Sequence, residues 1–209
     1  MGENIQVGKS RFGKMVSYPP LAPSADWFTA FLKALSNGKS EEESIVTANL
    51  TLNSFKELGR YVINDTNGDR IILSLAVEGG GKQLKKSDGL ESLRLSEHGN
   101  WRKVHMGGLE AALGRTPFYR DIEPGIKSVY QNLDIKSLEE FNIAIFQVLK
   151  SFLLGSNTPE RLFESRKCIA WQDRGKELAE NISMELSMIQ SLSEYGREAL
   201  LGIMMMDCL

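Results

Sequence analysis

Residues 60–77 read RYVINDTNGDRIILSLAV and predict an antiparallel β-hairpin. Two runs rich in β-branched and aliphatic residues, 60–63 and 70–77, flank the polar turn Asp65-Thr66-Asn67-Gly68-Asp69. The Asn-Gly pair tolerates the positive φ values that tight hairpin turns require. This hairpin is the clearest signal in the chain, and the fold class depends on what precedes and follows it.

Upstream of the hairpin, the pattern predicts one helix and one strand. Ser24 precedes apolar residues spaced three and four apart up to Leu35, and Asn37-Gly38 ends this pattern, which indicates a short amphipathic helix. Residues 44–52 are β-branched and alternating, which predicts a half-buried strand. Residues 90–95, beyond the hairpin, alternate again and are a candidate for a further strand.

From Asn100 onward the apolar period becomes helical. Helices are predicted over 100–113, 124–131, 137–154 and 183–205. Strands therefore come first and helices follow, without regular alternation of the two. This order predicts an α+β fold, with N-terminal antiparallel strands and a hairpin followed by a mainly helical C-terminal half, rather than a doubly wound parallel sheet.

The composition excludes several classes of function. The 209 residues hold 25 Lys and Arg against 27 Asp and Glu, a formal net charge of −2 that gives no basic excess for nucleic acid. Two cysteines, Cys168 and Cys208, are too few for a disulfide scaffold or a thiolate zinc site. No apolar run has the length of a signal-peptide core or a membrane span. We expect a cytoplasmic protein with no nucleic-acid or membrane partner, built as a flexible segment 1–14 and a single domain over 15–207.

Trp101 and His105 lie four residues apart in a predicted helix and so share one face, which Gly108 continues. The adjacent Gly107 and Gly108 each cost about 1 kcal/mol relative to alanine in a helix. Either close packing of another element or close approach of a ligand to the backbone must offset that cost. A histidine beside an indole can act as a general base or orient a substrate. The alternative is a packed histidine that is satisfied by a backbone carbonyl.

The segment Gly79-Gly80-Gly81-Lys82 follows a strand but lacks the spacing of a phosphate-binding loop. We expect it to be a mobile strand connection, in which Lys82 can still steer an anionic ligand. His98 and His105 have no third histidine or cysteine nearby, so no metal site is expected, and no cofactor either.

Asn142 falls on the apolar stripe of the predicted helix 137–154. An amide that faces a core requires hydrogen-bond partners, so Asn142 either pins the packing or points into a site.

Several pieces of the chain, taken in order, resemble the WbqC-like family, which is found among genes for O-antigen and other surface polysaccharides. The resemblance runs from about residue 15 to 201. In chain order, the first pieces are a proline-rich start before an aromatic helix (18–23 with Trp27-Phe28), an arginine that opens a hairpin (60–68) and a strand ending in a glycine-lysine loop (73–82). A Trp-x-x-x-His helix (Trp101 and His105) and a Thr-Pro-Phe-Tyr segment (116–119) follow. The last pieces are a helix that holds Asn142 and a closing Leu-Ser segment before a glycine (184–196).

The resemblance implies a protein that helps to modify sugars in polysaccharide assembly, by transferring an acyl or aminoacyl group to an amino sugar. In this hypothesis His105 deprotonates the sugar amine, Arg60 and Lys82 hold phosphate or carboxylate, Trp101 stacks on a sugar or base, and Asn142 is the fourth substrate-binding position. Its expected partner is a small sugar or nucleotide-sugar ligand.

Two departures from the family pattern favour a competing hypothesis. Many members begin with His-Gln-Pro where this chain has Ser17-Tyr18-Pro19, and Gln190 replaces the closing aspartate. The alternative is therefore a non-catalytic sugar-binding or assembly module that has lost catalytic residues. In a third interpretation, the apolar tail Met204-Met205-Met206 forms the interface of a homodimer.

Overall fold

The structure is a computed structural model that describes residues 16–52, 55–80, 93–155 and 187–206. Lys82, Cys168 and Cys208 lie outside these residues, and so does the whole predicted segment 1–14. The predicted division into a segment 1–14 and one domain over 15–207 stays a prediction. In chain order the described elements are α1 (Ala25–Ser36), α2 (Glu41–Asn49), the 3-10 turn η1 (Phe55–Leu58), β1 (Arg60–Asn64), β2 (Arg70–Ser74), α3 (Trp101–Leu113), α4 (Tyr119–Gln131), α5 (Leu138–Leu154) and α8 (Met188–Met206).

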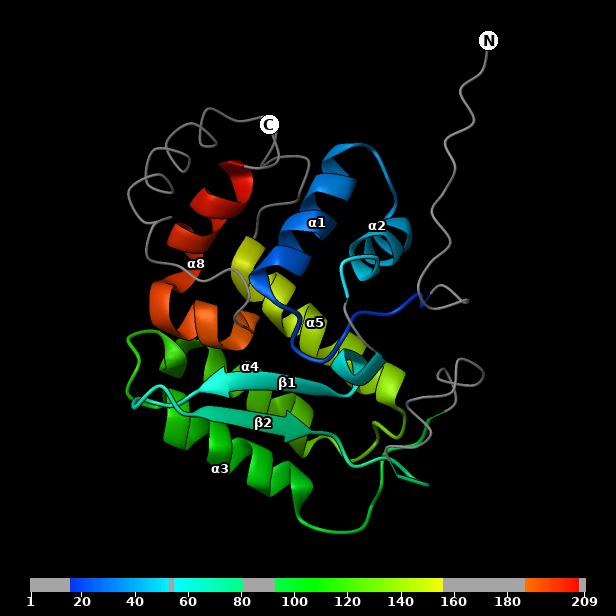
Figure 1. Cartoon of the computed structure of the whole chain (residues 1–209), viewed down its shortest axis with the longest axis vertical. Coiled ribbons are helices and arrows are strands. Elements are labelled where there is room, and N and C mark those ends of the chain that lie inside the picture. Colours follow the sequence, from blue (N-terminus) through cyan, green and yellow to red (C-terminus); the bar gives the residue numbers. More distant parts are fainter. Residues whose placement is uncertain (1–15, 53–54, 81–92, 156–186, 207–209) are drawn as a thin grey trace.

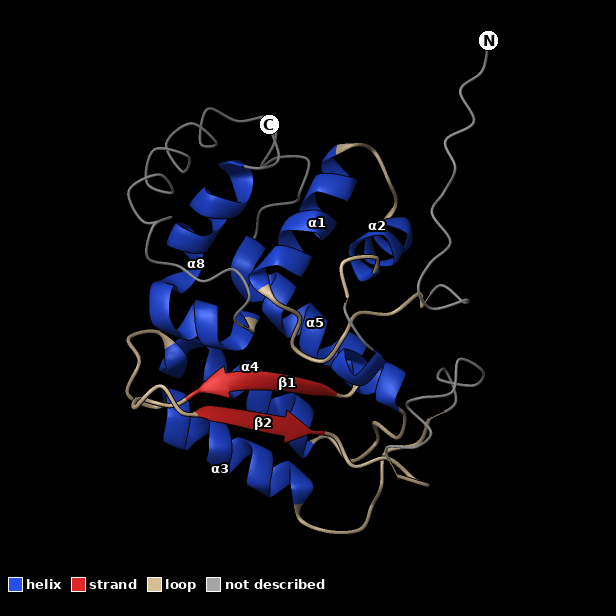
Figure 2. Ribbon diagram, in the orientation of Figure 1, coloured by secondary structure: helices blue, strands red, loops and turns tan. Residues whose placement is uncertain are grey.

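The predicted α+β class is confirmed. The described residues hold one sheet, the two-stranded antiparallel pair of β1 and β2, and helices pack around it (Figure 2). In Figure 1 the hairpin crosses the molecule between α3 below it and α1 and α8 above it. Both strands contact α3, while α5 packs on α4 and α8.

The predicted hairpin is confirmed, with Arg60 opposite Ser74 and Asn64 opposite Arg70. The side chain of Asp65 holds the turn, because its Oδ1 accepts the N–H groups of Asn67 and Asp69, each at 2.8 Å. β2 ends at Ser74 rather than at residue 77. The strand expected over 90–95 is reduced, in the described residues 93–95, to isolated bridges.

The strand predicted over 44–52 is wrong, because residues 44–49 belong to helix α2 and residues 50–52 follow its end. Ser40 and Glu43 form a capping box: the Ser40 hydroxyl accepts from the Glu43 N–H, and the Glu43 carboxylate accepts from the Ser40 N–H. This cap fixes the helix start at Glu41. Ile45 and Asn49 are then one turn apart and face the interior. The helix start therefore outweighs the β-branched composition of the segment.

The other helices follow the predicted apolar period. Helix α4 begins at Tyr119, five residues before the Pro124 at which a start was predicted, so the proline lies inside the helix. In α8, Gly196 has a φ of 74° and breaks the regular helix. Met204 belongs to the apolar tail that one interpretation of the sequence places between two subunits, and its side chain is buried in the core. The homodimer stays a prediction.

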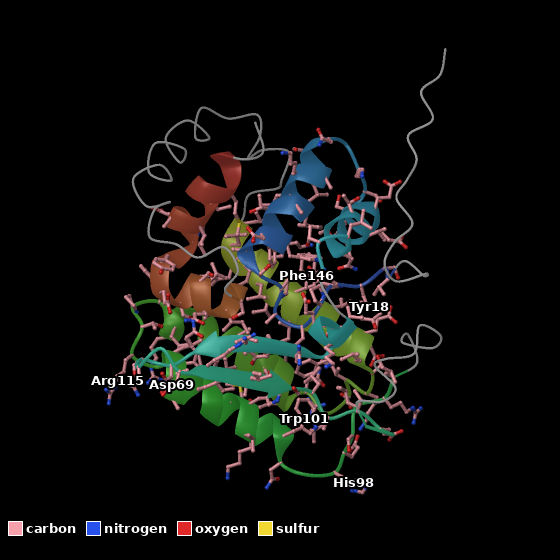
Figure 3. All side chains as sticks on the ribbon, viewed as in Figure 1. Tyr18, Asp69, His98, Trp101, Arg115 and Phe146 are labelled. Atoms are coloured by element: carbon pink, nitrogen blue, oxygen red, sulfur yellow. The ribbon has the colours of Figure 1, made fainter. Side chains whose placement is uncertain are left out.

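An aromatic cluster joins α1 to α5. Phe146 of α5 meets the rings of Trp27, Phe28 and Phe31 at centroid distances of 5.8, 5.5 and 5.2 Å. Figure 3 shows Phe146 beneath α1. All four rings are essentially fully buried, so this cluster holds α1 in place above the hairpin.

We expect Gly125→Ala to destabilise the fold by about 1–3 kcal/mol, because an added Cβ on α4 would lie 2.7 Å from Cγ1 of Val148 on α5. Gly107→Ala is the matched control: it also sits in a helix, and nothing lies within 4 Å of its added Cβ. That substitution should raise the free energy of unfolding by up to about 1 kcal/mol. Urea denaturation measures both changes, and a neutral Gly125→Ala would contradict the close contact of α4 with α5.

Candidate functional site

A cleft of about 670 Å³ lies between the outer face of the hairpin and the start of α1. Its volume is in the range of sites for small molecules. The wall residues come from the proline-rich segment before α1, the first turn of α1, the turn after α2, η1, the hairpin and the residue before α8: Pro20, Leu21, Ala22, Pro23, Ser24, Asp26, Thr51, Leu52, Glu57, Arg60, Tyr61, Val62, Asn64, Arg70 and Ser187.

Buried amide side chains hold the proline-rich wall. Asn49 of α2 donates from Nδ2 to the carbonyls of Val16 (2.8 Å) and Tyr18 (3.0 Å), and its Oδ1 accepts from the indole N–H of Trp27 at 2.9 Å. Ala22, within this wall, has a φ of 43°, a left-handed conformation that costs free energy for a residue with a Cβ. The amide contacts supply part of the energy that keeps the backbone in this shape.

Asn142 of α5 fixes the same wall to the start of the hairpin. Its Nδ2 donates to the carbonyl of Pro19 at 2.9 Å and to that of Leu58 at 2.7 Å. The side chain is completely buried, and its Oδ1 has no hydrogen-bond partner in the described structure. Of the two interpretations of Asn142, the geometry shows the pinning one. Asn142 is not among the residues that line the cleft, and its substrate-binding role stays a prediction.

The hairpin wall of the cleft follows the alternation of β1. Tyr61 and Ile63 are buried, whereas Arg60, Val62 and Asn64 are half-buried on the opposite face. Arg70 of β2, opposite Asn64, is exposed and also lines the cleft. The structure therefore brings Arg60 to a cleft, as expected of a ligand-binding residue, and adds Arg70, which the sequence prediction missed.

Gln190, which stands where the family resemblance expects an aspartate, closes the far end of β1. It is 3% exposed, and its Oε1 accepts from the Asn64 N–H at 2.9 Å. Its Nε2 donates to Glu194 at 2.7 Å. Ser187, just before α8, forms a bridge with Ser24, just before α1. An oxygen acceptor at position 190 thus ties α8 to the strand that carries Arg60.

His105 lies on the other side of the hairpin, in the core, and is 3% exposed. Its Nε2 is 3.0 Å from the carbonyl of Ser74, and its Nδ1 is 3.1 Å from the hydroxyl of Tyr130. The Tyr130 hydroxyl is in turn 3.1 Å from that of Tyr61. Both ring nitrogens of His105 are therefore occupied within a buried chain of hydrogen bonds.

The directions of these hydrogen bonds follow from their chemistry. A carbonyl only accepts, so Nε2 carries the proton and donates to Ser74. Burial lowers the pKa of His105 to about 4, so the ring is neutral and Nδ1 accepts from Tyr130. Tyr130 then accepts from Tyr61, and burial raises the pKa of both tyrosines. The chain runs from Tyr61 through Tyr130 and His105 to Ser74.

Trp101 packs beside this chain rather than in the cleft. Its ring contacts those of His105, Tyr130 and Phe141, and its indole N–H donates to the carbonyl of Ser96 at 2.9 Å. The guanidinium of Arg102 lies 4.7 Å from the centroid of the Trp101 ring. Trp101 begins α3 below the hairpin, and His98 lies away from it on an exposed loop (Figure 3).

The two helical glycines have different explanations. A Cβ on Gly108 would lie 3.3 Å from Leu73 of β2, whereas one on Gly107 would meet nothing. The sequence offered two explanations for a glycine here, close packing of another element or close approach of a ligand. At Gly108 the geometry shows close packing of another element. It lets α3 approach the strand whose Ser74 carbonyl binds His105.

The structure thus separates the predicted site residues into three groups. Arg60 lines the cleft, Asn142 anchors its wall, and His105 with Trp101 lies on the opposite face of the hairpin. Lys82 is outside the described residues. The catalytic role of His105 and the binding roles of the other four residues stay predictions. Side chains of a strand alternate between its two faces, so Asn64 lies on the same face as Arg60, and Arg70 is on that face across the turn. This alternation was the sequence signal that could have identified Asn64 and Arg70.

The described helices include none with both the length and the apolar character needed to cross a bilayer. The same residues hold no cluster of three His, Cys, Asp or Glu side chains arranged to bind a metal ion.

The sequence model of the WbqC-like protein family matches residues 40–201, which is most of the chain. The match includes both cleft arginines, His105 and Asn142, whereas the proline-rich wall precedes it. No curated protein matches the chain significantly. No solved structure does so either.

We expect Asn142→Ala to lower the free energy of unfolding by about 2–4 kcal/mol, because it leaves two buried carbonyls without donors and opens a cavity. Ile143→Ala, one position along α5 and 38% exposed, is the control and should cost less than about 1 kcal/mol. Urea denaturation distinguishes the two, and equal costs would show that Asn142 does not pin the wall.

We expect His105 to make the fold sensitive to acid. Its folded pKa of about 4 lies below the ordinary value of 6.5, so the unfolded chain binds the extra proton between these values and stability falls as the pH drops through this window. The loss amounts to about 3 kcal/mol by pH 4. Denaturation curves at pH 7 and pH 4 should show this part of the loss disappearing in His105→Gln and persisting in His98→Gln, the exposed-histidine control. An unchanged loss in His105→Gln would contradict a buried neutral ring.

Proposed function

The chain belongs to the WbqC-like protein family, and from this premise we propose that it binds a sugar or nucleotide-sugar in the cleft lined by Arg60. We further propose that it takes part in transferring an acyl or aminoacyl group to an amino sugar during surface-polysaccharide assembly. The family assignment supports the biological setting, and the cleft supports the ligand.

The observation that carries the proposal is the composition of the cleft wall. Arginine, carboxylate, amide and hydroxyl side chains line one cavity of about 670 Å³. Sugar hydroxyls both donate and accept hydrogen bonds, so a wall that offers both kinds of group suits them. Arginine adds a planar fork of donors that matches phosphate or carboxylate oxygens.

Transfer to an amino sugar requires a group that accepts a proton. The amine nitrogen attacks the carbonyl carbon of an acyl thioester, the carbon–sulfur bond breaks, and the amine loses one proton as amide and thiol form. Among the described lining residues, Asp26 and Glu57 have carboxylates that can take up this proton. The position of His105 behind the hairpin supports a positioning role, through Ser74, for the strand that carries Arg60.

A second candidate function, a binding module without turnover, has its own support. The described lining of the cleft contains no histidine, and His-Gln-Pro is replaced by Ser17-Tyr18-Pro19. This candidate uses the same cleft and the same ligand class, but it has no chemical step.

The full chain tests both candidates. We expect UDP-glucosamine to bind in isothermal titration, with an affinity that Arg60→Gln or Arg70→Gln lowers about tenfold or more. Lys103→Gln, which removes an exposed charge on α3, should leave the affinity unchanged. Mass spectrometry after incubation with a panel of coenzyme A thioesters and aminoacyl adenylates then reports turnover.

Binding with formation of an amide product supports the transferase, and Asp26→Asn or Glu57→Gln should then reduce kcat more than affinity. Binding without product across the panel supports the module. Binding that both Arg60→Gln and Arg70→Gln leave unchanged, or no binding of any amino-sugar nucleotide, contradicts the proposed ligand site.

A further inference from the structure

The two arginines of the cleft sit at opposite ends of its hairpin wall. Arg60 opens β1 and pairs with Ser74, whereas Arg70 opens β2 and pairs with Asn64. Their backbone positions are therefore four residue steps apart along the strands, which at the usual rise per residue corresponds to about 13 Å. Both side chains nevertheless line the same cleft.

Neither guanidinium has an ion-pair or side-chain hydrogen-bond partner among the described residues. The cleft carboxylates Asp26 and Glu57 differ, because each already takes part in an interaction of its own. A guanidinium carries five N–H donors arranged for bidentate contact with carboxylate or phosphate. The cleft therefore holds two guanidinium groups without such a partner, at two separate points of its wall.

The wall between these two points has a different character. Val62 lies midway along β1, half-buried between Arg60 and Asn64. The hydroxyl residues Ser24 and Ser187, which lie just before α1 and α8, line the same cleft. A ligand body with carbon faces and hydroxyl groups fits between the two arginines better than a second charge does.

We propose that the cleft is a two-anion site for an extended ligand, a nucleoside diphosphate sugar whose sugar ring carries a carboxylate. One arginine holds the diphosphate and the other holds the carboxylate, with the sugar hydroxyls between them. The inference rests on the proposed function and deepens it, because it names which nucleotide-sugars the site selects.

A single phosphate or carboxylate would not account for this arrangement. One small anion is best held where donors converge on one point, and it would leave the donors at the other end of the strand unused. A nucleoside diphosphate without a sugar acid also leaves one arginine unused. The volume of about 670 Å³ likewise suits a ligand much larger than one inorganic anion.

The test compares UDP-glucuronic acid with UDP-glucose by isothermal titration to the full chain. These ligands differ only in whether carbon 6 of the sugar is a carboxylate or an alcohol. We expect UDP-glucuronic acid to bind about tenfold or more tightly. Arg60→Gln and Arg70→Gln should each weaken UDP-glucuronic acid by a similar factor, whereas only one of them should weaken UDP-glucose.

The variant that leaves UDP-glucose unaffected identifies the arginine that holds the carboxylate, and it should abolish the preference between the two ligands. Lys103→Gln removes the same charge from the exposed surface of α3 and should change neither affinity. Arg→Lys at the same positions should restore only part of the loss, because lysine keeps the charge without the fork.

Equal affinities for the two ligands, or a preference that survives both arginine variants, would overturn the two-anion site while leaving sugar-nucleotide binding in place. Absence of binding by either ligand and by UDP-glucosamine would instead overturn the proposed function itself. Circular dichroism of each variant separates loss of a contact from loss of the fold.

Discussion

The hairpin of β1 and β2 depends on the buried chain of hydrogen bonds from Tyr61 through Tyr130 and His105 to Ser74. Two strands alone are only marginally stable in water, so the pair must be held by the helices around it. The chain begins on β1, crosses α4 and α3 and ends on β2, and therefore clamps both strands from one side. Because it takes up the inner face of the hairpin, the outer face remains for the cleft.

Two buried amide side chains stabilise the irregular backbone before α1. A segment that is neither helix nor strand leaves carbonyls without partners, and burial makes these costly. Asn49 and Asn142 donate to the carbonyls of Val16, Tyr18, Pro19 and Leu58, so each serves two. The bond from Asn142 to Leu58, two residues before Arg60, also links this wall to the hairpin. The cleft thus owes its shape to side chains that do not line it.

Local patterns in the sequence predicted the hairpin and most helices, because alternation and helical period are properties of neighbouring residues. The failure at α2 has the same origin. Ile45, Val46 and Thr47 suggested a strand, whereas the capping box that starts the helix lies before them, at Ser40 and Glu43. The cap was readable from the sequence.

The site was only partly predictable, for a reason of sequence distance. Arg60 could be found because it opens the hairpin, and Arg70 follows from it through the register of the strands. The partners of His105 could not be found this way, since Tyr130 is 25 residues and Ser74 is 31 residues from it. A pattern of neighbours contains no information on such contacts, so the sequence left open whether the histidine was a base or a packed ring.

The hydrogen bond from His105 to Ser74 connects the two faces of the hairpin, because Ser74 is the cross-strand partner of Arg60. A substitution at His105 that shifts β2 therefore also shifts the arginine in the cleft. Loss of activity in such a variant would not by itself identify a base. A base that touches substrate lowers kcat at constant affinity, whereas a residue that positions Arg60 lowers affinity in the same way as loss of the arginine. The division of the effect between kcat and KM, measured beside an Arg60 variant, decides between these roles.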